Sequence, residues 1–125
     1  MRLWHEALLS YLPRQQLLGQ HRECAALRGK GWGRKHSVVN YVFTHSPDKL
    51  VAYHQRVMDE MERRGYHPDS IWRIPTYRGK DLGHQENWAK NINYDGIIYD
   101  EHNEIYLQEC LNNLSSKGII IELTK

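Results

Sequence analysis

The residues of this sequence that could perform chemistry lie near its start. The run Gln20-His21-Arg22-Glu23 stands upstream of a basic segment that ends in Arg34-Lys35-His36. A carboxylate such as Glu23 can shuttle protons and stabilise a developing cation, and clustered basic side chains attract anions. From its spacing alone, Glu23 is interpreted as a plain exposed helix glutamate. A site for acid–base chemistry on an anionic ligand is the other interpretation.

Other patterns with chemical potential are incomplete. His84-Gln85-Glu86 matches half of the zinc deaminase signature, but the PCxxC half that would supply thiolate ligands is missing. Glycine takes every second position of residues 29–33, yet the GxxxxGK[ST] phosphate-binding motif is absent. This loop could still bind phosphates through its backbone amides, or only connect two helices. His21 and Cys24 lie too close in sequence to form a convincing nucleophile and base.

The overall composition excludes several classes of protein. The chain has 125 residues, of which 40% are hydrophobic and 26% are charged, so one packed domain is expected. No apolar run approaches the ~18 residues that cross a bilayer, and Trp4, His5 and Glu6 interrupt any signal-like start. Cys24 and Cys110 belong to no CxxC pair, which predicts buried reduced thiols. A soluble cytoplasmic protein is expected.

The charge of the chain is segregated. Residues 1–36 carry seven basic and two acidic side chains, a net charge of +5, while the remaining 89 residues carry a net charge of −3. Such asymmetry favours an anionic partner for the N-terminal third, with nucleic acid first among the candidates. A solvated basic face without a partner is the alternative.

Three segments have the apolar spacing and end signals of helices. Pro13 can start a helix over residues 14–28, in which Glu23 falls off the apolar stripe and points away from the core or along its edge. Ser46-Pro47-Asp48 predicts the start of a helix over 47–64 that Gly65 ends. The third predicted helix runs over 100–117.

The intervening and final segments are less regular. Short helical turns are expected at 70–73 and 85–92, because prolines and glycines interrupt residues 65–96. The apolar tail 119–123 is expected either to pair as a strand with 96–99 or to pack across the bundle. The predicted fold is mostly α, a compact single-domain three-helix bundle.

Several short runs resemble a known family when they are taken in order. The matching runs are MRLW at 1–4, LLGQHRE at 17–23, RKH at 34–36, the PDKL…ERRGY stretch between 47 and 66, and a weaker YRG at 77–79. In this respect the chain resembles the pyrimidine-dimer DNA glycosylases typified by phage endonuclease V. The resemblance covers about the first 66 residues and implies that 1–125 is one endonuclease V-like domain.

The resemblance implies a DNA glycosylase with associated AP lyase activity on damaged pyrimidines in duplex DNA. In that family the N-terminal amine attacks C1′ of the damaged nucleotide, an imine forms, and β-elimination cuts the strand. By position, Glu23 is the essential helix glutamate and Arg22 its arginine neighbour. An α-amine suits this role, because its pKa near 7.7–8.0 leaves part of it neutral at pH 7.

The N-terminus departs from the family pattern. The phage family exposes a small second residue once its initiator methionine is removed, whereas here the second residue is Arg2, after which methionine is usually retained. The Met1 amine is therefore the expected nucleophile. The alternative is that this branch has lost or changed the lyase chemistry.

The complete prediction is a metal-independent, cofactor-free monomer that acts on damaged double-stranded DNA in the cytoplasm at the nucleoid. Glu23 and Met1 are the predicted catalytic residues. Trp32 is expected either in the core or stacked on a base. The predicted DNA contacts are Arg2, Arg14, Arg22, Arg28, Lys30, Trp32, Arg34, Lys35 and His36. The alternatives are a noncatalytic nucleic-acid-binding module and a small helical regulatory protein whose basic face is incidental.

Overall fold

The computed structural model describes residues 2–123, and its longest helix begins where the sequence predicts. Helix α2 (Pro47–Arg63) starts at Ser46, whose hydroxyl accepts a hydrogen bond from the backbone N–H of Asp48 at 3.2 Å. Pro47 fills the first helical position, where its missing N–H leaves no bond unmade. Gly65 adopts φ +89° just after the last turn, so the predicted helix and its end signal are confirmed.

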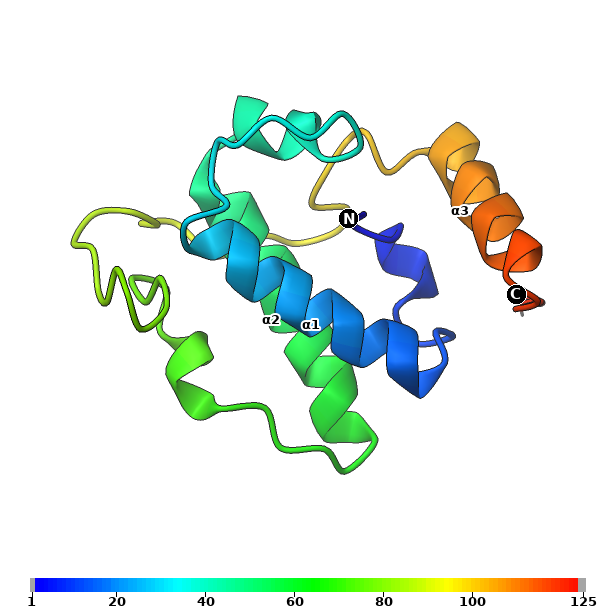
Figure 1. The fold of residues 1–125 in the computed structure, drawn as a ribbon, viewed down its shortest axis with the longest axis horizontal. Coiled ribbons are helices and arrows are strands. Elements are labelled where there is room, and N and C mark those ends of the chain that lie inside the picture. Colours follow the sequence, from blue (N-terminus) through cyan, green and yellow to red (C-terminus); the bar gives the residue numbers. More distant parts are fainter. Residues whose placement is uncertain (1, 124–125) are drawn as a thin grey trace.

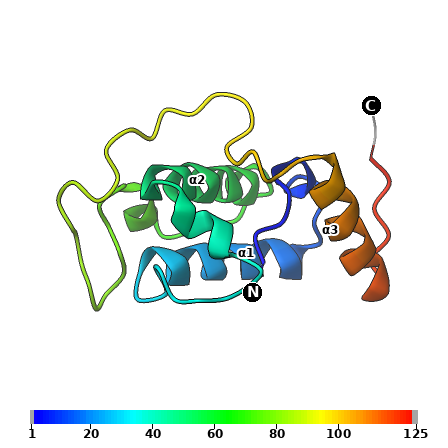
Figure 2. The same cartoon turned by 90° about the horizontal axis from the view of Figure 1, so that it is seen from above.

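Helix α1 (Arg14–Arg28) also matches its predicted range, and it packs across α2 (Figure 1). Leu17, Cys24 and Leu27 on one side of α1 are buried in the same core as Leu50, Val57 and Met61 of α2. Figure 2 shows the two helices as adjacent layers, with the third helix at one end of both. The mostly helical, single-domain fold is therefore confirmed.

Helix α3 (Glu104–Ser116) begins four residues later than predicted. The Asn103 side chain accepts a hydrogen bond from the backbone N–H of Tyr106 at 2.9 Å, which caps the helix there. Cys110 and Leu114 are buried, and Gly118 takes φ +83° as the predicted end. Within residues 2–123, no helix is both long and apolar enough to span a membrane.

Three short 3-10 helices complete the regular structure of the described chain. They are η1 (Glu6–Leu8), η2 (Asn40–Thr44) and η3 (Ser70–Arg73). The predicted turn at 70–73 is confirmed, but the one at 85–92 is wrong. Gly83 and Asn87 have φ values of +61° and +67°, and a residue in that left-handed region cannot continue a right-handed helix.

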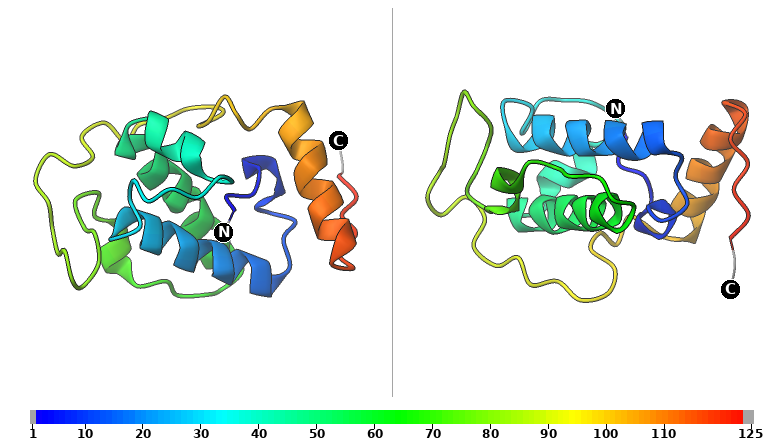
Figure 3. Two further views of the ribbon diagram at one scale, coloured as in Figure 1. Left: turned by 45° about the horizontal axis from the view of Figure 1, so that its top comes forward. Right: turned by 90° about the horizontal axis from the view of Figure 1, so that it is seen from below.

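The tail 119–123 packs and does not pair. No strand is present in residues 2–123, where the only ladder contact is an isolated bridge between Tyr77 and His84. Figure 3 shows the tail running back beside α3, and Ile119 and Ile121 pack against the core. Of the two expectations for this segment, packing is the one observed.

The irregular segment between α2 and α3 is fixed by long-range hydrogen bonds. The Glu6 carboxylate accepts from the backbone N–H of Ile98 at 2.9 Å and pairs with the Arg56 guanidinium at 2.6 Å. The Asp48 carboxylate accepts from the backbone N–H of Lys90 at 2.7 Å. These bonds hold residues 90–98, which form no helix, against α2 and the N-terminal segment.

Buried histidines predict loss of stability in acid. Burial lowers the pKa of His102 to about 3, and the pKa values of His5, His21 and His54 also lie below their usual value. Below about pH 6.5 the unfolded chain therefore binds more protons than the folded chain. The free energy of unfolding consequently decreases as the pH is lowered. His102 alone would remove up to about 1.4 kcal/mol per pH unit between its unfolded and folded pKa values.

Urea unfolding between about pH 7 and about pH 5 measures this effect. His102→Phe keeps a ring of similar size but cannot titrate, so its free energy of unfolding should fall less steeply with acid. The variant starts from a lower stability, because Glu6 N–H and the Tyr41 hydroxyl lose their partners on His102. Equal slopes for both proteins would show that His102 is not the titrating group.

Candidate active site

The carboxylate of Glu23 faces the start of the chain and not open solvent. Glu23 is half-buried on α1, and its Oε2 accepts a hydrogen bond from the backbone N–H of Arg2 at 3.1 Å. Its position at the edge of the core agrees with the expectation from helical spacing. Arg22, its neighbour, is exposed. Met1, the predicted nucleophile, lies outside the described residues.

A single buried amide, that of Gln20, organises this contact. Its side chain lies one turn before Glu23 and is 1% exposed. Its Nε2 donates to Glu23 Oε2 at 3.3 Å and to the carbonyl oxygen of Arg2 at 2.9 Å. Its Oε1 accepts from the backbone N–H of Trp4 at 2.7 Å and from the Tyr53 hydroxyl at 3.0 Å. Gln20 therefore fixes the carboxylate and the chain beside it at the same time.

The N-terminal segment is also held from the side of α3. The Tyr106 hydroxyl donates to the carbonyl oxygen of Leu3 at 2.5 Å. His102 Nδ1 accepts from the backbone N–H of Glu6 at 3.3 Å, so the proton of the neutral ring is on Nε2, which donates to the Tyr41 hydroxyl at 2.7 Å. Residues 2–6 are thus clamped between α1 and α3 (Figure 3).

A cavity of about 240 Å³ opens beside the carboxylate. This N-terminal cavity is lined by Arg2, Trp4, Glu23, Val38, Asn113 and Lys117. The Lys117 Nζ lies 5.2 Å from the Trp4 ring centre, and the Arg2 guanidinium carbon lies 5.7 Å from the same ring. A carboxylate, two cations and an aromatic face therefore share one small space.

The predicted DNA-contacting residues fall into separate groups. Arg34, Lys35 and His36 are exposed on the loop after α1. Arg14 lies at the other end of α1, with its guanidinium 5.5 Å from the ring centre of Tyr66. The 15 residues between the ends of α1 span roughly 22 Å, so these groups lie on distant parts of the surface.

The prediction that Arg28 contacts DNA is wrong. Its side chain is 0% exposed, and it donates to the carbonyl oxygens of Trp72, Ile74 and Tyr77 at 2.7–2.9 Å. It also lies 3.0 Å from Nδ1 of His54, and burial lowers its pKa to about 10. A guanidinium with internal acceptors cannot reach a phosphate, and Arg28 instead ties the chain after η3 to α1.

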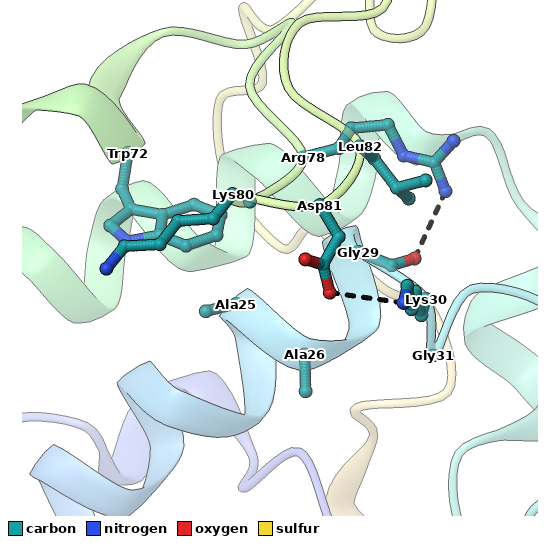
Figure 4. A pocket seen from close by; sticks show the side chains of 11 residues that line it. Ala25, Ala26, Gly29, Lys30, Gly31, Trp72, Arg78, Lys80, Asp81 and Leu82 are labelled. Carbon is teal, nitrogen blue, oxygen red and sulfur yellow. Dashed lines mark hydrogen bonds and ion pairs between the residues drawn. The ribbon is translucent and has the colours of Figure 1, made fainter.

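Lys30 borders a second cavity, of about 320 Å³, between the end of α1 and residues 78–82 (Figure 4). Its Nζ pairs with the Asp81 carboxylate at 3.1 Å, and both side chains are largely exposed. Such a pair contributes at most about 1 kcal/mol, so Lys30 can exchange Asp81 for a phosphate. Arg78, in contrast, is fixed by the carbonyl oxygens of Arg28 and Gly29.

Trp32 is half-buried in the loop after α1. Its ring meets Phe43 and Trp88 edge to face, with centre distances of 5.0 and 5.6 Å. These contacts agree with core packing, and the exposed remainder of the ring leaves the stacking hypothesis as a prediction.

Residues 2–123 contain no group of three His, Cys, Asp or Glu side chains with the arrangement of a metal site. Within the HQE run, His84 Nδ1 lies 3.0 Å from the hydroxyl of Thr76. Cys24 and Cys110 are buried free thiols, as predicted, and burial raises the pKa of both.

Sequence reasoning assigned no role to three polar residues of this site, which are Gln20, Asn113 and Lys117. Gln20 stands three positions before Glu23, a spacing that makes helix neighbours, and this was the signal that could have found it. Asn113 and Lys117 lie on α3, some ninety residues from Glu23. Nothing local in the sequence places them at the N-terminal cavity.

Comparison with known proteins identifies a family for the first part of the chain. A family model described as pyrimidine dimer DNA glycosylase matches residues 1–74, which is more than half of the chain. The match includes Arg2, Gln20, Glu23 and the loop after α1, but not α3. No curated protein and no solved structure matches the chain.

Proposed function

The chain belongs to the pyrimidine dimer DNA glycosylase family, and on that premise we propose that it removes damaged pyrimidines from duplex DNA and then cuts the strand as an AP lyase. The observation that carries the proposal is the contact between Glu23 Oε2 and the backbone nitrogen of Arg2, beside the N-terminal cavity. A general acid–base group and the start of the chain meet there.

In the proposed reaction the neutral N-terminal amine forms a bond to C1′ of the damaged nucleotide. The glycosidic bond breaks, and the base leaves with the electron pair and takes up a proton. The bond from C1′ to the ring oxygen then opens to give a protonated imine. Loss of a proton from C2′ expels the phosphate at C3′ and cuts the strand. Glu23 stabilises the cationic sugar and transfers these protons.

The amine that reacts depends on processing of Met1. The backbone nitrogen of Arg2 already lies 3.1 Å from Glu23, and removal of Met1 would turn this amide into an α-amine. With Met1 retained, as the large Arg2 side chain favours, the Met1 amine is the nucleophile. Intact-protein mass spectrometry distinguishes the two forms.

DNA is proposed to cover the N-terminal cavity and the basic surface around it. The proposed phosphate contacts are Arg2, Arg14, Arg22, Lys30, Arg34, Lys35 and His36, and Trp32 is proposed to stack on a base. We propose that residues 1–125 act as one domain, because Arg28 ties residues 72–77 to α1 and Tyr106 ties α3 to Leu3.

A noncatalytic DNA-binding module is the second candidate, and the large residue at position 2 is the observation that favours it. Borohydride trapping on abasic duplex DNA separates the two. Reduction of an imine links an enzyme covalently to the DNA, whereas a binder leaves no covalent product. A third candidate, a helical protein with an incidental basic face, would bind DNA only weakly at physiological salt.

The basic loop after α1 is expected to contribute to DNA affinity without sequence preference. Arg34→Ala and Lys35→Ala should each weaken binding and reduce the slope of log K against log salt by about 1. Arg63→Ala and Arg64→Ala are matched controls, because Glu60 already pairs with both side chains. Equal losses at both places, measured by salt titration of a labelled duplex, would contradict a localised binding surface.

Gln20→Glu is expected to slow base release while the fold is kept. The new carboxylate can still accept from Trp4 N–H and the Tyr53 hydroxyl, but it cannot donate to Glu23 or to the carbonyl of Arg2. Two adjacent carboxylates also raise the pKa of one of them. We expect the rate at neutral pH to fall by about tenfold or more, and its acid limb to move to higher pH.

The pH–rate profile separates positioning from simple destabilisation. Gln15→Glu adds the same charge on an exposed part of α1 and should leave the profile unchanged. A Gln20→Glu protein with the parental rate and profile would show that the amide does not organise Glu23.

A further inference from the structure

Helix α3 closes the N-terminal cavity although it lies outside the 1–74 family match. Asn113 of this helix and Lys117, its C-cap residue one turn later, line the same cavity as Glu23 and Arg2. The figures place α3 at the end of the α1–α2 layers, with the start of the chain between them (Figures 1 and 3). The wall opposite Glu23 is therefore made by a segment to which the family match assigns no role.

The side chain of Asn113 has an unused acceptor. Its Oδ1 is buried and accepts no hydrogen bond from any residue between 2 and 123. A buried amide oxygen without a partner costs roughly 1–3 kcal/mol, so a native protein usually gives it one. Oδ1 itself is shielded from solvent, so binding at the cavity requires the amide to turn about χ2, which exchanges the positions of its oxygen and nitrogen.

The side chain of Lys117 is a cation at the same cavity. It is exposed and forms no ion pair with any described residue, and its Nζ lies above the face of Trp4 at 5.2 Å. A lysine that is not neutralised within the protein is available for a phosphate.

We propose that α3 binds the nucleotide under attack, with Asn113 hydrogen-bonded to an N–H on the edge of the damaged pyrimidine and Lys117 paired with an adjoining phosphate. The inference rests on the proposed function, because it takes C1′ to react beside Glu23. The base is bonded directly to C1′, so its edge extends across the cavity to the facing wall. A volume of about 240 Å³ is below that of pockets for drug-sized ligands, so the cavity is too small for both joined pyrimidines of a dimer with their sugars.

Two DNA substrates distinguish the proposed base contact of Asn113 from the proposed phosphate contact of Lys117. One carries a single pyrimidine dimer and the other a single abasic site, which has the phosphates but no base. Asn113→Leu should slow cleavage of the glycosidic bond in the dimer duplex by about tenfold and leave cleavage of the abasic duplex at the parental rate. Asn113→Ala should behave in the same way, which rules out a steric block by leucine.

Thermal unfolding tells a binding role from a structural one. Leucine removes a buried unpaired polar atom, so Asn113→Leu should melt at or above the temperature of the parent. Asn112→Leu, on the neighbouring exposed position, controls for added apolar surface. A variant that melts lower, or that loses both reactions equally, would overturn the proposed base contact.

Lys117→Ala should weaken binding of both duplexes several-fold and reduce the salt slope by about 1. Lys90→Ala removes an exposed lysine on another part of the surface and should change neither. Parental binding by Lys117→Ala would overturn the phosphate contact. The parent protein is measured alongside, and if it releases no base and cuts no abasic site, the proposed function itself has failed, whatever the α3 variants do.

Discussion

Glu23→Gln is expected to lower base release by about 10²–10⁴-fold, the range in which acid–base groups contribute to catalysis. A neutral amide can neither take up a proton nor stabilise the cationic sugar as a carboxylate does. The fold should be unaffected, because the glutamine oxygen can still accept from Arg2 N–H and Gln20 Nε2. DNA binding should tighten slightly, since one negative charge near the phosphates is removed.

Single-turnover cleavage of the glycosidic bond in a dimer-containing duplex measures the chemical step, and a gel shift of the same duplex measures binding. Glu86→Gln is the matched control, because it removes an exposed glutamate from the loop between η3 and α3. A Glu23→Gln protein that releases base at the parental rate would assign Glu23 to the plain surface interpretation.

The helices were predictable because residues next to each helix end determine where it begins and ends. Ser46 with Pro47 at the start of α2, and Gly65 and Gly118 after α2 and α3, act within one turn of the helix they bound. The start of α3 was placed too early, because the Asn103 cap decides it and the polar residues 100–103 were included in the predicted helix. Local signals gave no warning of Asn87, whose left-handed backbone prevents the turn expected at 85–92.

The candidate site was predictable only in part. Glu23 followed from the resemblance and from its place off the apolar stripe, whereas the role of Arg28 was misjudged. Charge counting treats every arginine as exposed, and the acceptors that bury Arg28 are carbonyl oxygens of residues 72–77, which any sequence carries. Asn113 reaches the site through the packing of α3 on the N-terminal segment, which no spacing rule encodes.

Blocking the N-terminal amine is expected to abolish strand cleavage although no side chain changes. Acetylation removes the lone pair and the titratable group, so no imine can form. An uncleaved N-terminal tag should act in the same way, because it moves the amine several residues from Glu23. Removal of the tag, which leaves a native Met1, should restore activity. Borohydride trapping on abasic duplex DNA compares the acetylated, tagged and native forms.

The pattern of trapping identifies the nucleophile. Trapping by the native form alone supports the terminal amine, and mass spectrometry of the adduct shows whether Met1 or Arg2 carries it. If all three forms trap equally, the nucleophile is a lysine. Lys30 and Lys35 are the candidates from sequence, but Lys117 is the lysine that shares a cavity with Glu23, so the adduct should then map to α3. If no form traps while all bind DNA, the protein is a noncatalytic module.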